Sequence, residues 1–172
     1  MKEIKIKYLD GANEVKAIKN GDWIDLYAYD NYIYEVGAFF MVNLGVSMKL
    51  PKGYEAHLAM RSGTFKKYGL IQTNAVGVID ESYCGNDDIW KLPVYCLAEP
   101  VEPAHDPMHQ KEIYDEGDIG KIENKKQFVI KKGDRLCQFR IMKKMQAEEE
   151  IKFTKVDNME DESRGGFGNS GI

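Results

Sequence analysis

One stretch decides how this chain folds: Asn74-Ala75-Val76-Gly77-Val78-Ile79-Asp80-Glu81-Ser82-Tyr83-Cys84-Gly85. It holds two short β-branched runs, which predict a hairpin with Asp80 on its buried side and Tyr83 three residues further on. The backbone N–H and C=O groups of such a hairpin can bind the edge of a flat base. Tyr83 can then lie against a sugar, and Asp80 can hold a water molecule. An ordinary Greek-key hairpin is the alternative that these residues alone leave open.

Alternation of apolar and polar residues with a period of two continues outward from this stretch. It recurs in five segments, namely 4–8, 46–50, 54–58, 128–130 and 136–141. Turn signals such as Pro51-Lys52-Gly53 and Gly133-Asp134 separate these segments. The pattern predicts an all-β sandwich or barrel, with a single helical turn at 64–68. Residues 143–150 are helix formers, but the segment that follows them favours a strand.

Length and composition limit the class of protein. The 172 residues predict one domain, and the net charge of −4 argues against a protein that coats nucleic acid. An odd number of cysteines without paired spacing (Cys84, Cys96 and Cys137) indicates free thiols in a reducing compartment. The first residues do not resemble a signal peptide, and no apolar run reaches the ~20 residues of a membrane span. We therefore expect a cytoplasmic protein that binds neither nucleic acid nor membranes.

Residues 99–127 differ in composition from the rest of the chain. They contain three of the five prolines, and their eight acidic residues against four lysines give a local charge of −4. A loop of this length is usually functional or mobile. A solvated loop is the simpler interpretation, and an arm that binds a regulatory protein partner is the sharper one. His105 and His109 have the spacing of a helical metal pair, but Pro107 lies between them and disfavours the helix.

Four further blocks accompany the opening stretch in a fixed order. They are Asp22-Trp23-Ile24-Asp25-Leu26, Arg61-Ser62-Gly63-Thr64, Lys132-Gly133-Asp134-Arg135-Leu136-Cys137-Gln138 and the glycine-rich tail from Ser163 to Gly171. Together the five blocks resemble the trimeric dUTPases, in the form found in Gram-positive bacteria and their phages. The resemblance covers nearly the whole chain except 99–127. It implies one jelly-roll-like β-barrel domain over residues 1–172 that hydrolyses dUTP to dUMP and pyrophosphate.

The first two blocks are implied to bind the triphosphate. By resemblance, Asp25 orients water on a Mg²⁺ ion that the triphosphate carries, and this metal keeps several waters while using few carboxylates. Arg61, Ser62 and Gly63 offer a cation, a hydroxyl and free backbone N–H groups to an anion. Met60 stands where the family usually has proline, a departure that touches no ligand atom.

The central block is implied to select the nucleotide and to activate water. Asn74 and the backbone of Val78 and Ile79 are expected to bind the uracil edge, in a space too tight for the methyl group of thymine. Tyr83 packs under the deoxyribose, where a 2′-hydroxyl would clash. Asp80 is the expected general base, which orients a water for in-line attack on the α-phosphorus.

The last two blocks are implied to close the site. Gln138 is the expected phosphate contact, while Asp134 and Arg135 are expected to form ion pairs within or between subunits. Residues 157–172 are expected to be a flexible lid, in which Arg164 binds the γ-phosphate and Phe167 stacks on the base. The spacing between these two residues is shorter than in the commonest dUTPase pattern, so Arg164 is the firmer assignment.

The resemblance also implies a homotrimer whose active sites are shared between subunits. Two other functions stay open. A dCTP deaminase has a similar fold, but it needs a glutamate in the strand that here spans residues 89–94, and none is present. A protein-binding regulator would use the nucleotide pocket as a switch and residues 99–127 as its contact surface.

Overall fold

The described part of the chain folds into four antiparallel sheets and one short helix. This computed structural model describes residues 3–16, 21–105, 126–145 and 154–155. The largest sheet has the strand order β2 (Ile24–Tyr27), β11 (Arg135–Lys143), β6 (Tyr54–Met60) and β8 (Gly77–Asp80). A second sheet has the order β4 (Phe39–Asn43), β9 (Lys91–Cys96) and β7 (Leu70–Gln72). Two pairs, β1 (Lys5–Tyr8) with β5 (Val46–Lys49) and β3 (Tyr32–Tyr34) with β10 (Phe128–Ile130), complete the β structure.

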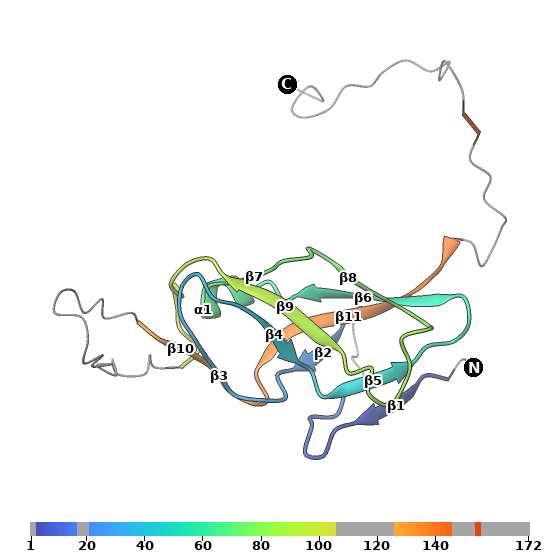
Figure 1. The fold of residues 1–172 in the computed structure, drawn as a ribbon, viewed down its shortest axis with the longest axis horizontal. Helices are drawn as coiled ribbons and strands as arrows, with labels where there is room; N and C mark the ends of the chain where they lie inside the picture. Colours follow the sequence, from blue (N-terminus) through green and yellow to red (C-terminus); the bar gives the residue numbers. More distant parts are fainter. Residues whose placement is uncertain (1–2, 17–20, 106–125, 146–153, 156–172) are drawn as a thin grey trace, which may run out of the picture.

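The strands enclose one hydrophobic core. Figure 1 shows them gathered into a single body, with the helix α1 (Thr64–Tyr68) at one end and β1 and β5 at the other. Both larger sheets contribute fully buried side chains, such as Leu58 from β6 and Leu92 from β9. Trp90 packs edge-on against Phe139 of β11 at 5.3 Å between ring centroids. The expected all-β, jelly-roll-like architecture and the helical turn at 64–68 are both confirmed.

A bulge explains an irregularity in the sequence pattern of β11. The pairing of β11 with β2 shifts register between Arg135 and Cys137, so Leu136 and Cys137 are both buried although they are neighbours. An extra residue of this kind changes which face each later side chain occupies. The apolar positions at Leu136 and Phe139 are therefore three residues apart and still share the core.

The predicted hairpin at residues 74–85 is wrong. β7 pairs with β9 and β8 pairs with β6, so the turn between β7 and β8 carries the chain from one sheet to the other. The turn is tight, because the N–H of Val76 donates to the carbonyl of Asn74 at 2.5 Å and Ala75 has a positive φ of 54°. Asp80 also lies exposed at the end of β8, and not on a buried side as expected.

The beginning of the compositionally distinct segment lies along α1. The N–H groups of Glu102 and Ala104 donate to the carbonyls of Lys66 and Lys67 at 3.0 and 3.2 Å. The expectations for residues 106–125 and for the tail at 157–172 lie outside the described residues, as does most of 143–150. Within the described part, no helix is both long and apolar enough to cross a membrane.

Candidate active site

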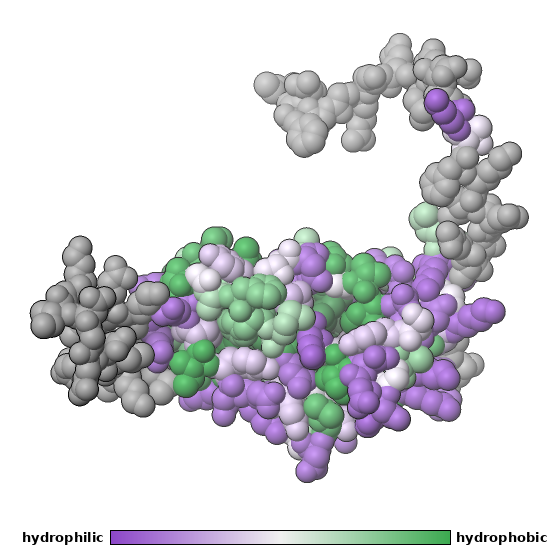
Figure 2. Space-filling view, viewed as in Figure 1, coloured by the Kyte–Doolittle hydropathy of each residue, from purple (hydrophilic) through white to green (hydrophobic). Residues whose placement is uncertain are grey.

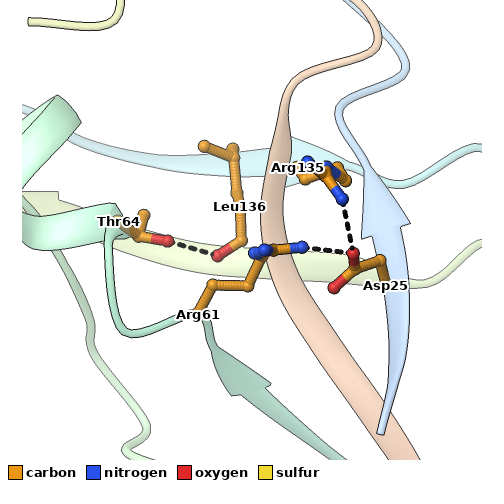
Figure 3. A network of polar contacts seen from close by, with 5 residues as sticks. All are labelled: Asp25, Arg61, Thr64, Arg135 and Leu136. Carbon is orange, nitrogen blue, oxygen red and sulfur yellow. Dashed lines mark hydrogen bonds and ion pairs between the residues drawn. The ribbon is translucent and has the colours of Figure 1, made fainter. Parts of the chain in front are cut away.

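Two arginines and an aspartate meet where three neighbouring strands, β2, β11 and β6, lie side by side. Asp25 of β2 lies opposite Gln138 of β11, which in turn lies opposite Ala59 of β6. Arg61 directly follows β6, and its Nη1 donates to Oδ2 of Asp25. Nη1 of Arg135 donates to the same oxygen at 3.2 Å, as Figure 3 shows. We call Asp25, Arg61 and Arg135 the arginine cluster.

The turn after β6 is fixed to β11 at two points. The backbone N–H of Arg61 donates to the carbonyl of Leu136 at 3.0 Å. The Thr64 hydroxyl donates to the same carbonyl at 2.6 Å, as Figure 3 shows. Thr64 is buried, which makes this contact part of the packed structure. The backbone N–H groups of Ser62 and Gly63 make no hydrogen bond to any described residue. The turn thus holds two donors available beside the arginine cluster.

A cavity of about 420 Å³ opens in front of this turn. Its lining includes Arg61, Ser62, Gly63, Lys67 and Arg135, and we call it the cationic cavity. Three positive side chains and two free N–H groups around one space are the donor set that binds a polyphosphate. Next to these groups, Nε2 of His105 lies 2.9 Å from Oδ2 of Asp134, so the beginning of the distinct segment reaches the same cavity.

A second, smaller cavity of about 230 Å³ lies beside β8, and we call it the base cavity. Four of the predicted site residues line it: Asn74, Val78, Ile79 and Tyr83. The rest of the lining is Met41, Leu58, Gly77, Ile89, Trp90, Lys91 and Pro93. Apolar walls with a few polar groups suit a flat ring that needs orientation as well as burial.

Asp80 stands at the end of β8, next to the base cavity. Its Oδ1 accepts hydrogen bonds from the hydroxyl of Ser82 at 2.5 Å and from the backbone N–H of Ser82 at 2.7 Å. These bonds stabilise the ionised form and lower the pKa of Asp80, with a smaller contribution from the charge of Lys144. Oδ2 takes no part in the two bonds to Ser82, and the residue is exposed, so an ionised oxygen is available to bind a water molecule.

The cationic cavity and Asp80 lie at opposite ends of β6. Asp80 pairs with Glu55 near the start of β6, whereas Arg61 follows its last residue. Six residues of extended strand span about 20 Å at roughly 3.3 Å per residue. Within one chain, the structure therefore brings the predicted residues together in two separate groups, one around the base cavity with Asp80 and one around the cationic cavity, and we call these groups the half-sites.

The residues that could hold Mg²⁺ are few. Among the described residues, no three His, Cys, Asp or Glu side chains are close enough to form a metal site. Asp25 still fits its expected role, because both arginines donate to Oδ2 alone. No described residue donates a hydrogen bond to Oδ1. This oxygen could therefore accept a hydrogen bond from a water molecule on a Mg²⁺ ion that a triphosphate carries.

Other predicted residues are placed less directly. Gln138 adjoins the arginine cluster through its register with Asp25 but lines neither cavity, and Arg164 and Phe167 lie outside the described residues. The expected ion pair of Arg135 is confirmed. Lys67 was not anticipated, although its position four residues after Gly63 on a helical turn places both on one face.

Comparisons with known proteins agree with this arrangement. A family model described as dUTPase matches residues 23–90. The chain is 43% identical over 170 residues to the SPbeta prophage-derived deoxyuridine 5'-triphosphate nucleotidohydrolase YosS of Bacillus subtilis, a match that covers 98% of each chain. This chain belongs to the dUTPase family. The Bacillus relative, encoded by a prophage, also confirms the resemblance to the Gram-positive and phage branch of the dUTPases.

Solved dUTPase structures have the same fold. A mutant of the dUTPase of Staphylococcus bacteriophage 80alpha, with dUpNHpp, matches with a TM-score of 0.68 and 20% identity, covering 99% of both chains. A mutant dUTPase from phage phi11 of S. aureus, whose structure describes a structural Mg(II) ion, matches with a TM-score of 0.64 and 19% identity. That match covers 92% of this chain and 99% of the other.

Proposed function

We propose that this dUTPase-family chain hydrolyses dUTP to dUMP and pyrophosphate, in a homotrimer whose active sites are shared between subunits. The observation that carries the activity is the 43% identity to a dUTP nucleotidohydrolase over 98% of both chains. The two half-sites support it, because one suits a base and a water and the other suits a polyphosphate.

The base cavity is proposed to select a deoxyuridine nucleotide. Asn74 and the backbone of Val78 and Ile79 bind the polar edge of uracil, and a close fit around the ring excludes the methyl group of thymine. Tyr83 packs under the sugar and disfavours a 2′-hydroxyl. Tyr83 suits this contact because it is 41% exposed at the cavity and its hydroxyl lies 3.4 Å from the carbonyl of Ile89.

Asp80 is proposed to activate the attacking water. Ser82 fixes one carboxylate oxygen, and the other accepts a proton from the water as its oxygen bonds to the α-phosphorus. The bond between the α-phosphorus and the oxygen that bridges to the β-phosphate breaks, and pyrophosphate leaves. The product dUMP keeps the new oxygen, so one dUTP and one water give one dUMP and one pyrophosphate.

The cationic cavity is proposed to bind the phosphate chain. Arg61, Lys67 and Arg135 neutralise its charge, Ser62 and Gly63 donate backbone hydrogen bonds, and Gln138 donates from the neighbouring strand. Such neutralisation supplies much of the catalysis in phosphoryl transfer. Asp25 would hold Mg²⁺ through water, and the bound metal would offset the charge on the triphosphate. Arg164 and Phe167 are proposed to cover the bound nucleotide from the tail.

The distance between the half-sites supports a shared site. Asp80 and Arg61 of one chain are separated by about 20 Å along β6, whereas the α-phosphate of a single nucleotide lies only a few ångströms from the β- and γ-phosphates. A complete site therefore pairs the base cavity of one subunit with the cationic cavity of another.

An exposed apolar face gives a surface for this assembly. Phe39 of β4 and Ile71 of β7 both lie opposite Tyr95 of β9, and Phe39 and Ile71 are 61% and 37% exposed. Met41 extends the same face beside the base cavity. Figure 2 shows hydrophobic residues gathered over these strands. Burial of such a face between subunits is the ordinary reason for its composition.

Free cysteines support a cytoplasmic location. Cys84, Cys96 and Cys137 form no disulfide. Burial raises the pKa of the Cys137 thiol and of the Cys96 thiol, which keeps both protonated. Unreacted thiols of this kind suit a reducing compartment.

Deamination of dCTP is not favoured by the site. No glutamate lines the described base cavity, and β9 contains none. A regulatory role for residues 99–127 has one supporting observation, since His105 and Glu102 connect that segment to Asp134 and α1 beside the cationic cavity. Bound phosphates would then lie close to the base of the segment.

Pyrophosphate release from dUTP, dTTP, UTP and dCTP, each with Mg²⁺, tests the proposed function. We expect rapid release from dUTP alone, because only its base and sugar fit the base cavity. Comparable release from dTTP or UTP would contradict the roles of the cavity and Tyr83. Release of ammonia from dCTP without pyrophosphate would establish the deaminase.

A further inference from the structure

Gln72 connects the base cavity to the backbone of β6. The last residue of β7, Gln72 is half-buried between the two larger sheets. Its Nε2 donates to the carbonyl of Leu58 at 3.1 Å, where the pairing of β6 with β8 ends. The same Nε2 donates to Oδ1 of Asn74 at 2.7 Å, and Asn74 lines the base cavity.

These two contacts fix which way both amides face. The carbonyl of Leu58 can only accept a hydrogen bond, so Gln72 must turn its NH₂ group toward it. The other hydrogen of that NH₂ group then points to Asn74, which must present its oxygen. The reversed Gln72 amide would place Oε1 against the Leu58 carbonyl, and two acceptors repel. The Nδ2 group of Asn74 therefore remains as a free donor, because no described residue accepts from it.

We propose that Gln72 is a positioning residue that sets the base specificity of the site by holding Asn74 as a hydrogen-bond donor toward the 4-carbonyl of uracil. The inference rests on the proposed hydrolysis of dUTP and names a residue that acts through Asn74 without touching the nucleotide. Uracil carries an acceptor at this position, and cytosine carries an amino group, which is a donor. A fixed donor in the cavity thus binds uracil and is left unpaired against cytosine.

Discrimination arises when a base covers this group. Asn74 is exposed in the free protein, so water satisfies its Nδ2 group until a base fills the cavity. A polar group that is then buried without a partner costs more than an ordinary hydrogen bond contributes. If Asn74 were free to rotate its amide, it would offer an acceptor to cytosine as readily as a donor to uracil. Gln72 prevents that rotation because the backbone carbonyl of Leu58 cannot change its own polarity.

The test compares the Gln72→Leu variant with the unchanged protein, using pyrophosphate release from dUTP and dCTP with Mg²⁺. We expect kcat/KM for dUTP relative to dCTP to fall by roughly 3- to 10-fold, as for loss of one hydrogen bond. The change should lie mostly in KM, because Asp80 and the cationic cavity are untouched. The ratio does not depend on how much of the variant is folded. Gln127→Leu, at another half-buried glutamine, is the matched control and should leave the ratio unchanged.

A double-mutant cycle separates positioning from simple packing. In an Asn74→Ala background, Gln72→Leu should have no further effect on the ratio, since the amide that it orients is gone. An equal effect of Gln72→Leu in both backgrounds, or none in either, would overturn the positioning role. If the unchanged protein releases pyrophosphate from dUTP and only this cycle fails, the proposed function stands. If it releases none from dUTP, both are overturned.

Discussion

At the scale of single residues, the site depends on hydrogen bonds that fix the polarity or charge of one group. Ser82 holds the Asp80 carboxylate ionised, Gln72 holds Asn74 as a donor, and Asp25 holds two arginines together. In each pair, the supporting residue lies beside the residue that would meet the nucleotide. Substitutions of the supporting residues should therefore change the chemistry of the site more than its stability.

Ser82→Ala should raise the pKa of Asp80 toward its ordinary value. The Ser82 hydroxyl is the largest cause of the lowered pKa, while the backbone N–H at the same position remains in the variant. A carboxyl group with a lowered pKa stays ionised until the pH falls below that pKa. The acid limit of turnover should therefore move to higher pH in Ser82→Ala.

Carbon-detected NMR titration of the side-chain carboxyls measures this pKa, and the spectrum of Asp80→Asn identifies the signal. Ser82→Thr keeps a hydroxyl and is the matched control, which should retain the low pKa. An Asp80 pKa that is the same in Ser82→Ala and in the unchanged protein would show that the hydroxyl bond has no electrostatic effect.

At the scale of elements, the sequence predicted where strands lie better than it predicted which strands pair with each other. Alternation at Tyr54, Ala56 and Leu58 located β6, because burial of every second residue is a local property. The switch of sheets between β7 and β8 was missed, since it depends on a tight turn at Ala75 and on which strands lie nearby in space. The wrong expectation that Asp80 lies on a buried side has the same cause.

The candidate site was predictable to a similar degree. The order of the blocks indicated the residues around both cavities, including Arg61 and Tyr83. Their division into two half-sites does not follow from the local sequence patterns, because it arises from the direction of β6, and only the family resemblance implied that subunits share a site. The role of Gln72 was also hidden, since it depends on a Leu58 carbonyl that becomes available only where a sheet pairing ends.

The segment at 106–125 should be dispensable for turnover. The contacts that hold its flanks lie outside the segment itself: Glu99 and Lys126 join the two flanks to each other, and His105 joins one flank to Asp134 of the body. Replacing 106–125 with a Gly/Ser linker of the same length keeps these flanks and their spacing. We expect kcat and KM for dUTP to change by less than about twofold. A large loss of kcat would place part of this segment in the active site.

At the scale of the whole molecule, the proposed active site needs residues from more than one copy of this chain. The base cavity with Asp80 and the cationic cavity with Arg61 belong to opposite ends of one strand. In the proposed assembly, the exposed apolar face over β4, β9 and β7 is buried between copies. Under this proposal catalysis requires assembly, because only an oligomer with closed symmetry can complete every site.

Mixing two inactive variants measures this central claim directly. Asp80→Asn and Arg61→Ala should each lose most pyrophosphate release from dUTP, because every site in either homo-oligomer lacks one group. The two variants are unfolded and refolded together in equal amounts, and about a quarter of the wild-type activity should then return. In that fraction of sites, an Arg61→Ala chain supplies the intact Asp80 and an Asp80→Asn chain supplies the intact Arg61. Subunit exchange is verified by native mass spectrometry. Mixed oligomers that remain as inactive as the separate variants would contradict the shared site.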